Sequence, residues 1–331
     1  MEKKVRMADI AKHLGVSTVT VSKALAGKDG VSESVRIKIK QTASEMGYQG
    51  KQAAHEVSVG ETVGVLIHER FLSKDQSFYL SLYERVVASL AKYDMFGLLE
   101  SVLWEDEENL VQPRLVQSGR VKSLIVVGSM STDYLDFIRR MGLPAVELDA
   151  YDAHSDLDTV ISDGYYGMYR MTNYLIQRGH RNIAYLGSVG ATSSITDRYF
   201  GYCRALQESG IQLRTDWVLP DRDDRGNFQM DLPAELPTAF VCNCDAAAYH
   251  LLRLLNTKGL RVPADVSVVS FDDFVFSDLS DPKITTYAVD MDGMARASVE
   301  QLRARIADSE RDIEFRVVTG FLREKESVKP L

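Results

Sequence analysis

Cysteine is scarce in this chain of 331 residues, and long hydrophobic runs are missing. The three cysteines, Cys203, Cys242 and Cys244, are too few for a disulfide framework, and Cys-Asn-Cys alone is a poor metal signature. No apolar segment approaches the roughly 20 residues needed to cross a bilayer, and the basic N-terminal stretch lacks the apolar segment of a signal peptide. We therefore expect a cytoplasmic protein in which Cys203 and Cys242 are buried apolar residues.

Signatures of catalysis are missing as well. Gly187-Ser188-Val189-Gly190 is a loose glycine pair rather than a dinucleotide-binding fingerprint, and no P-loop occurs. The six histidines are scattered without a metalloprotease motif, and Ser193-Ser194 has no convincing base partner. The sequence therefore predicts neither an enzyme nor a cofactor nor a metal site.

Charge is unevenly distributed along the chain. Hydrophobic residues make up 45% and charged residues 26%, which is typical of globular proteins with a sizeable core. The net charge of −8 combines a basic head, with ten lysines and arginines against six acids in residues 1–60, and an acidic body. This asymmetry favours a nucleic-acid-binding module joined to a domain that does not bind nucleic acid.

Three short helices are predicted in the head. Residues 7–14 have apolar side chains at the spacing of one helical face, Gly15 ends this helix, and Ser17 caps a second helix over 18–26. A third helix follows Ser32. Its predicted buried side consists of Val35, Ile39, Ala43 and Met46. Short helices joined by a glycine-containing turn are typical of the helix-turn-helix arrangement.

The second helix carries the candidate DNA contacts. Val21, Ala24 and Leu25 are predicted to face inward, which leaves four side chains outside: Thr18, Val19, Ser22 and Lys23. Short hydroxyls and one long cation near a helix N-terminus suit base edges and phosphates in a major groove. The alternative is a three-helix interaction module without a DNA role.

The head closely resembles the lactose/galactose-repressor (LacI) family of bacterial transcriptional regulators. The matching residues, at the family's spacing, are Asp9-Ile10-Ala11, Gly15-Val16-Ser17, Thr20-Val21-Ser22, Val31-Ser32, Arg36 and Gly47-Tyr48. The resemblance implies that Thr18, Val19 and Lys23 read bases, with Val19 against a thymine methyl and Lys23 on guanine. It implies that Ser17, Thr20 and Ser22 face the DNA backbone, although local capping would also explain Thr20 and Ser22.

Residues 49–62 depart from the family's hinge. The family's short hinge helix usually contains Pro-Asn, then Ala-Arg, and a leucine that wedges into the central minor groove of the operator. Here Gly50-Lys51, His55 and Val57 stand at those positions. Valine is smaller and lowers helix propensity, so we expect a hinge that folds less readily or kinks DNA less. Packing of hinge on hinge in a dimer is an alternative or additional role for Val57.

The body alternates between short apolar strands and amphipathic helices. Strands are predicted at 63–68, 96–101, 123–128, 145–149, 159–163, 183–187, 217–220, 238–243, 266–271 and 285–290, with a terminal strand pair within 313–324. Helices are predicted at 78–92, 106–118, 133–141, 164–178, 197–209, 245–258 and 291–308. This pattern indicates two α/β subdomains, each with a doubly wound parallel sheet covered on both faces, and a ligand cleft at the strand ends.

The resemblance to the LacI family continues through the body. Its matching segments are Gly179–Tyr185, Arg198-x-x-Gly201-Tyr202, Pro237–Phe240 and Val266–Asp273. They imply the effector-binding core that is similar to periplasmic binding proteins. The implied domains are the head (1–49), the hinge (50–61) and a core (62–331), which has an N-subdomain (about 62–160 and 291–318) and a C-subdomain (about 161–290 and 319–331).

Five residues are candidates for effector binding. Arg198 and Asp272 match family residues that hold sugar hydroxyls, Asp149 ends a strand at the expected cleft, and Phe78 could stack on a ring. Asp245 stands in the family's Asn-Asp position, where Cys244 replaces the usual asparagine. Each polar candidate could instead cap a helix or bridge the subdomains, which is the role we expect for Asp273.

These patterns predict a cytoplasmic regulator, a repressor, that binds a near-palindromic operator as a homodimer. A small-molecule effector, a sugar or sugar derivative, would control operator affinity. A nucleobase- or nucleoside-responsive regulator is the first alternative. A solute-binding sensor without a DNA role is the second.

Overall fold

The computed structural model describes residues 7–25, 31–46, 61–72, 77–152, 154–223 and 225–331. The chain divides into two compact units, Met1–Val59 (the head) and Gly60–Leu331 (the core). Within the described residues, no helix is long and apolar enough to span a membrane.

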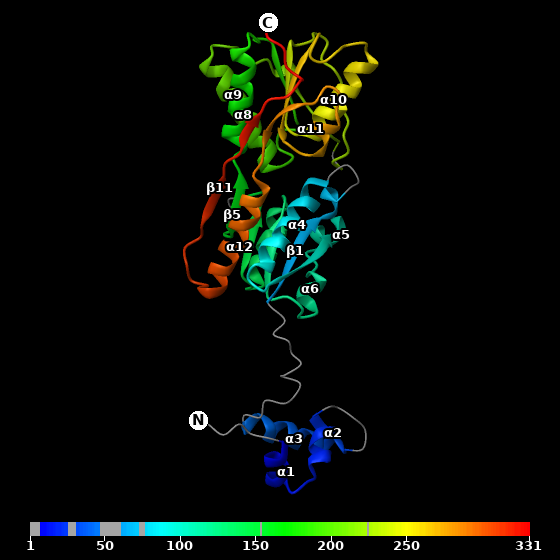
Figure 1. The fold of residues 1–331 in the computed structure, drawn as a ribbon, viewed down its shortest axis with the longest axis vertical. Coiled ribbons are helices and arrows are strands. Elements are labelled where there is room, and N and C mark those ends of the chain that lie inside the picture. Colours follow the sequence, from blue (N-terminus) through cyan, green and yellow to red (C-terminus); the bar gives the residue numbers. More distant parts are fainter. Residues whose placement is uncertain (1–6, 26–30, 47–60, 73–76, 153, 224) are drawn as a thin grey trace. The chain divides into compact units, whose positions relative to one another are not determined.

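Three helices form the head: α1 (Met7–Leu14), α2 (Thr18–Leu25) and α3 (Glu33–Glu45) (Figure 1). Ile10, Val21 and Ile39, one from each helix, are fully buried against one another in a small apolar core. Val35, Ala43 and Met46 pack on the same core, which confirms the predicted buried side of the third helix.

The turn between α1 and α2 has the predicted chemistry. Gly15 has a φ of 67°, a left-handed conformation that glycine adopts without strain. The backbone N–H of Val16 donates to the carbonyl of Ala11 (3.0 Å), and the Ser17 hydroxyl accepts from the backbone N–H of Thr20 (3.0 Å). Ser17 is therefore the N-cap of α2.

The core contains two six-stranded sheets. The first has the order β11-β5-β4-β3-β1-β2, and all its neighbours are parallel. Its strands are β1 (Thr62–His68), β2 (Phe96–Val102), β3 (Ser123–Val127), β4 (Ala145–Leu148), β5 (Asp158–Ser162) and β11 (Phe315–Val318). This sheet and its helices form the N-subdomain.

The second sheet has the order β12-β10-β9-β8-β6-β7 and forms the C-subdomain with its helices. Its strands are β6 (Ile183–Leu186), β7 (Val218–Leu219), β8 (Ala239–Cys242), β9 (Ser267–Asp272), β10 (Thr285–Ala288) and β12 (Phe321–Arg323). Only β12 runs antiparallel to its neighbour, β10, among the paired strands of the described residues. The two observed sheets confirm the predicted α/β core.

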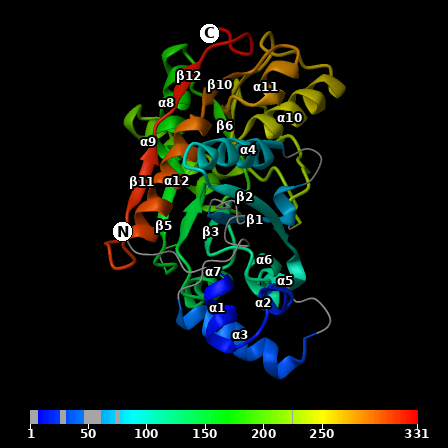
Figure 2. The same ribbon diagram turned by 60° about the horizontal axis from the view of Figure 1, so that its bottom comes forward.

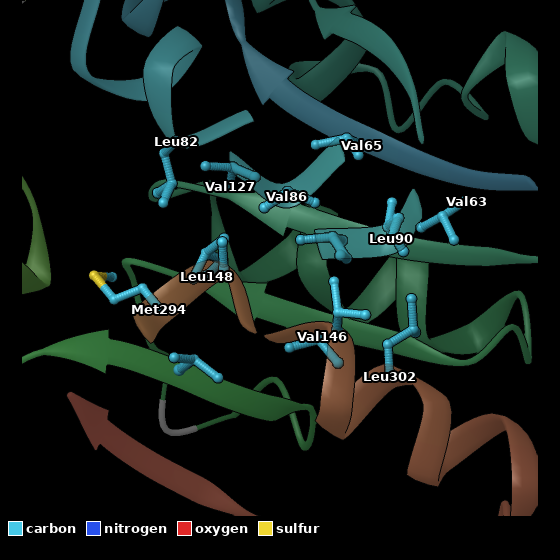
Figure 3. Packing of buried hydrophobic residues seen from close by; sticks show 14 of the residues in the cluster. Val63, Val65, Leu82, Val86, Leu90, Val127, Val146, Leu148, Met294 and Leu302 are labelled. Carbon is cyan, nitrogen blue, oxygen red and sulfur yellow. The ribbon is translucent and has the colours of Figure 1, made fainter. Parts of the chain in front are cut away.

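Helices cover both faces of the first sheet. Side chains of β1 alternate between the two faces. Val63 and Val65 pack under α4 (Ser77–Ala91) and α12 (Met291–Ala307) (Figure 3). Leu66 belongs to the apolar cluster on the other face. That other side packs against α7 (Thr132–Arg140), near the short helices α5 (Trp104–Glu108) and α6 (Arg114–Gln117) (Figure 2). Burial on both faces explains why the strands are continuous apolar runs.

The second sheet is covered in the same way. Helices α8 (Gly164–Gln177) and α9 (Ser193–Glu208) supply one core, and α10 (Asp245–Thr257) supplies the other. The short helix α11 (Val275–Leu279) follows β9. Two single turns, Glu69–Phe71 and Thr215–Trp217, follow β1 and precede β7.

The structure corrects four details of the sequence prediction. The helix expected at 106–118 is divided into α5 and α6, because Leu110 has a φ of 53° and Pro113, which has no N–H, caps α6. Helix α9 begins at Ser193 rather than at residue 197, because Thr192 caps it. The terminal strands do not pair with each other: β11 joins the first sheet and β12 the second. Cys242 is buried as expected, but Cys203 is only partly buried.

One carboxyl group inside the N-subdomain makes stability depend on pH. Glu147 on β4 is fully buried, and burial raises its pKa to about 7, although its Oε2 accepts from the Ser155 hydroxyl (2.7 Å). Between about pH 4.5 and about pH 7, Glu147 is therefore protonated in the folded protein and ionised in the unfolded chain. The stability that this proton contributes is present below about pH 4.5 and is lost as the pH rises through about 7.

Replacing Glu147 by glutamine should remove this dependence. Glu147→Gln is expected to raise the free energy of unfolding at about pH 8 by about 2 kcal/mol and to leave it little changed at about pH 4.5. Urea unfolding at both values measures the effect, with the exposed Glu310→Gln as control. An equal change at both values would contradict the assignment to Glu147.

Candidate functional site

The exposed face of α2 is the candidate DNA interface. Thr18, Val19, Ser22 and Lys23 are exposed, and Val19 has 63% of its surface accessible, which is unusual for an apolar residue. Ser17 and Thr20 share a hydrogen bond between their hydroxyls (2.8 Å), so both already take part in capping. Val57 lies outside the described residues. The inward positions Val21 and Ala24 are fully buried, as predicted.

A cavity of about 640 Å³, its open mouth included, lies between the two subdomains. Its walls are the segments that follow the carboxyl ends of β1, β4, β6, β8 and β9, where parallel α/β sheets bind ligands. All five predicted effector residues line it: Phe78, Asp149, Arg198, Asp245 and Asp272. Sequence positions almost 200 residues apart therefore meet in this space, here called the cleft cavity.

Arg198 is the buried cation of the cleft cavity. It lies on α9 with 5% of its surface exposed, its guanidinium 4.0 Å from the centre of the Phe271 ring. One Nη donates to the carbonyl of Asn243 (2.7 Å), and the other lies 3.4 Å from Oδ1 of Asp272. Its Nε is buried and has no hydrogen-bond partner among the described residues. Burial opposes its charge, yet the carboxylates of Asp272 and Asp149 raise its pKa.

Two aspartates hold strained backbone positions at the ends of their strands. Asp149 has a φ of 65° and Asp272 a φ of 115°, both unusual for residues with a side chain. Burial raises the pKa of both carboxyls, while Arg198 lowers it. Asp149 also accepts hydrogen bonds from Tyr79 and from the Ser162 hydroxyl (3.3 Å). Strain of this kind persists where the fold imposes it, often at binding sites.

Asp245 lines the cavity but is occupied by protein groups. Its Oδ1 accepts from the hydroxyls of Ser270 and Thr286, and its Oδ2 accepts from the backbone N–H of Phe274 (2.6 Å). These bonds tie α10 to β9, β10 and the turn after β9. Asp245 therefore fixes the wall of the cleft cavity. Asp273 forms ion pairs with Arg323 and Lys325, which belong to the same subdomain, so these pairs do not bridge the subdomains as expected.

Cys244 has a definite structural role. Its Sγ accepts from the backbone N–H of Ala247 (3.4 Å), so the thiol caps α10. Burial raises the pKa of this thiol to about 12, which keeps it protonated and unreactive at neutral pH.

Sequence reasoning missed a second arginine and most of the aromatic lining. Arg222 forms two hydrogen bonds with the buried Asp221 (3.0 and 2.6 Å) and lies over the Phe228 ring (5.1 Å). Phe78 and Phe274, from different subdomains, approach to 6.1 Å between ring centres. Besides Phe274, the lining aromatic residues that the sequence analysis did not name are Phe71, Tyr79, Phe228 and Phe276. The one available signal was position, because Arg222 follows the strand end at Leu219.

A helix-turn-helix head with an exposed polar helix face, joined to a two-subdomain core with a buried ligand-sized cavity, defines the class of DNA-binding transcriptional regulators. Comparison with known proteins agrees. Residues 6–50 match the profile of the bacterial regulatory proteins of the lacI family, and residues 172–328 match a periplasmic-binding-protein-like domain.

Proteins that are similar to this chain over nearly its whole length are also transcriptional regulators. The HTH-type transcriptional repressor PurR of Pectobacterium carotovorum subsp. carotovorum is 28% identical over 334 residues, covering 97% of this chain and 96% of the relative. A solved complex of the transcriptional regulator CelR with cellobiose has a TM-score of 0.70 at 22% identity, covering 98% and 100% of the two chains. The lac repressor dimer bound to operator and the anti-inducer ONPF has a TM-score of 0.64 at 20% identity, covering 99% and 100%.

The chain therefore combines a DNA-binding domain of the lacI family of bacterial regulatory proteins with a periplasmic-binding-protein-like domain. It is a DNA-binding transcriptional repressor and not an enzyme.

Proposed function

We propose that a sugar or sugar derivative binds in the cleft cavity and controls the affinity of a homodimer for its operator. The observation that carries this proposal is the buried Arg198, with a free Nε, between the strained carboxylates of Asp149 and Asp272. A guanidinium and carboxylates in fixed geometry bind vicinal hydroxyls through charge-assisted hydrogen bonds. The aromatic side chains of both subdomains would pack on the faces of the ring.

The connections between the subdomains explain how a ligand could act on DNA binding. The chain passes between the two sheets after β5, after β10 and between β11 and β12. A ligand that contacts both walls would bind a closed arrangement of the subdomains better than an open one. It would shift operator affinity by that difference in affinity. CelR, similar to this chain in fold, is solved with cellobiose.

A nucleobase or nucleoside is the alternative effector. The aromatic residues support it, because Phe78 and Phe274 come from opposite subdomains and could enclose a flat ring. The polar groups serve either ligand, since carboxylates and arginine also bind the edges of bases.

Titration of the full-length protein with matched panels of sugars and nucleosides tests this proposal. Calorimetry reports binding, and operator affinity with and without each compound reports control. A sugar that binds and changes operator affinity supports the proposal, whereas a nucleoside that does so alone supports the alternative. If no compound changes operator affinity, the cleft cavity has no regulatory role.

The DNA-binding assignments belong to the same proposal. Thr18, Val19 and Lys23 would contact bases in the major groove, and Ser17, Thr20 and Ser22 would contact the DNA backbone. Val57 would reach the minor groove. We take residues 1–49 as the head, 50–61 as the hinge, and 62–160 with 291–318 and 161–290 with 319–331 as the two subdomains. A repressor of this kind would act in the cytoplasm.

Removal of one exposed cation tests the DNA interface. Lys23→Ala is expected to weaken specific operator binding about 10- to 100-fold, because a base contact is worth about 1–3 kcal/mol. Binding to unrelated duplex DNA should change much less. Fluorescence anisotropy on both duplexes measures this, with Lys258→Ala on the core as the charge-matched control. Equal losses on both duplexes would make Lys23 a phosphate contact instead.

A further inference from the structure

A second hollow opens beside the cleft cavity. From the N-subdomain, Arg70 and Trp104 line this outer pocket. From the C-subdomain, it is lined by residues of the segments 188–192, 222–223 and 225–226. Phe71, Thr192 and Arg222 line both hollows, so the outer pocket adjoins the cleft cavity. A ligand with its ring in the cleft cavity could extend into it.

The outer pocket carries an excess of positive charge. Arg70, Arg222 and Arg225 line it, against one lining carboxylate, Asp223. The Asp223 carboxylate forms hydrogen bonds within its own loop. Its Oδ1 accepts from the backbone N–H groups of Arg225 and Asn227, and its Oδ2 accepts from the Asn227 side chain (2.9 Å). Arg222 is paired with the buried Asp221, so Arg70 and Arg225 are the lining cations for which the described residues show no ion pair.

Arg70 is the half-buried cation of this wall. It donates to the carbonyl of Ser129 and lies over the rings of Phe71 (4.7 Å) and Trp104 (5.5 Å). Its Nε is buried without a hydrogen-bond partner among the described residues. Burial lowers its pKa, and Glu107, which opposes this effect, is itself paired with His68 (3.1 Å). Buried charges in proteins are normally paired, so Arg70 has a place for a counter-ion.

The wall that the C-subdomain contributes also has groups that can bind an anion. Asp221 engages Nε and one Nη of Arg222, which leaves the other Nη without a hydrogen bond among the described residues. Arg225 is exposed, and none of the described carboxylates forms an ion pair with it. Thr192 caps the 16-residue helix α9, and the positive end of a helix dipole favours anions. Three guanidinium groups and this helix end converge from both subdomains.

We propose that the outer pocket binds a phosphate group of the effector. The effector would then be a phosphorylated sugar or nucleoside, with its ring in the cleft cavity and its phosphate between Arg70 and Arg225. Arginine suits this task because its planar donors match phosphate oxygens in pairs. A phosphate contacted from both subdomains would also favour their closed arrangement. This inference rests on the proposed function, since it requires an effector in the cleft cavity.

Matched pairs of compounds test the inference on the full-length protein. The probes are glucose and glucose 6-phosphate, ribose and ribose 5-phosphate, and adenosine and AMP, each titrated by calorimetry. At least one phosphorylated compound is expected to bind about 10-fold or more tightly than its parent, with a preference that weakens as salt is added. The pair that shows the preference distinguishes a sugar phosphate from a nucleotide.

Arginine variants assign the preference to the outer pocket. Arg70→Gln is expected to reduce it about 10-fold and the exposed Arg225→Gln about 3-fold or more, in keeping with the strength of charge-assisted hydrogen bonds. Arg225→Gln keeps the test decisive if Arg70→Gln fails to fold. Arg181→Gln is the control. Arg181 precedes the amino end of β6, away from the outer pocket, so this variant should keep the full preference.

The outcomes separate this inference from the proposed function. Parent compounds that bind as tightly as their phosphates, or a preference untouched by both variants, would overturn the phosphate site and leave the proposed function standing. Absence of binding by both members of every pair would overturn both.

Discussion

Loss of effector control is the expected result of replacing Arg198 by glutamine. Arg198 is buried, interacts with the carboxylates of Asp149 and Asp272, and has an Nε without a hydrogen-bond partner among the described residues. Charge-assisted hydrogen bonds are worth about 1.5–3 kcal/mol each, so removing two should weaken effector binding about 100-fold or more. Calorimetry measures the binding, using the compound found to bind the unmodified protein. Operator release measures the response.

A second readout separates the charge of Arg198 from its shape. Without the cation, the pKa values of Asp149 and Asp272 should rise further, because burial would no longer be opposed. A raised carboxyl pKa makes stability fall as the pH rises, so urea unfolding of the variant should show a steeper loss between about pH 5 and about pH 8. Arg204→Gln, exposed on the same helix, is the control. Unchanged binding by Arg198→Gln would contradict the assignment.

Replacement of Gly201 by alanine should destabilise the C-subdomain severely. A Cβ at Gly201 would lie 2.1 Å from the carbonyl oxygen of Tyr165 and 2.9 Å from the backbone N of Tyr169, so α8 and α9 touch there. Alanine normally stabilises a helix interior by about 1 kcal/mol relative to glycine. Here the helices must separate, and we expect a loss of about 3 kcal/mol in the free energy of unfolding.

Gly164→Ala is the matched control for this prediction. A Cβ at Gly164, the first residue of α8, would meet its nearest neighbour, Cβ of Asp197 on α9, at an ordinary 3.4 Å. Its free energy of unfolding in urea should stay within about 0.5 kcal/mol of the unmodified protein. If Gly201→Ala were equally stable, the close approach of α8 and α9 would not exist in solution. The glycine of the Arg198-x-x-Gly201 motif thus has a packing reason, separate from ligand binding.

Most of the fold was predictable because the spacing of apolar residues in the sequence follows the buried faces of the strands and helices. Strand β1 is a continuous apolar run since both of its faces are covered, and the spacing of Ile10 and Ile39 follows from a core of three helices. The break between α5 and α6 was missed because apolar residues continue across it as Leu110 and Val111. Pro113 was the signal that should have divided the helix.

The cleft was predictable only where a residue lies at the end of a strand or in a recognisable motif. Asp149, Arg198 and Asp272 met one of these conditions and line the cavity. Arg222 follows the end of β7, so its position could have indicated it, whereas Phe228 lies farther along a loop that only the three-dimensional fold brings to the cavity. The occupied state of Asp245 could not be read from sequence either, since its partners Ser270 and Thr286 are distant positions.

The arrangement of the last two strands has a consequence for synthesis of the protein on the ribosome. Strand β11 completes the sheet that begins at β1, more than 240 residues earlier, and β12 completes the other sheet. Neither subdomain can therefore reach its native sheet until residues 315–323 have left the exit tunnel. Until then, Val160 on β5 and Tyr287 on β10 lie on strands with an unpaired edge, the kind of edge that recruits foreign strands. Nascent chains of this repressor should accordingly depend on chaperones until β12 has left the exit tunnel.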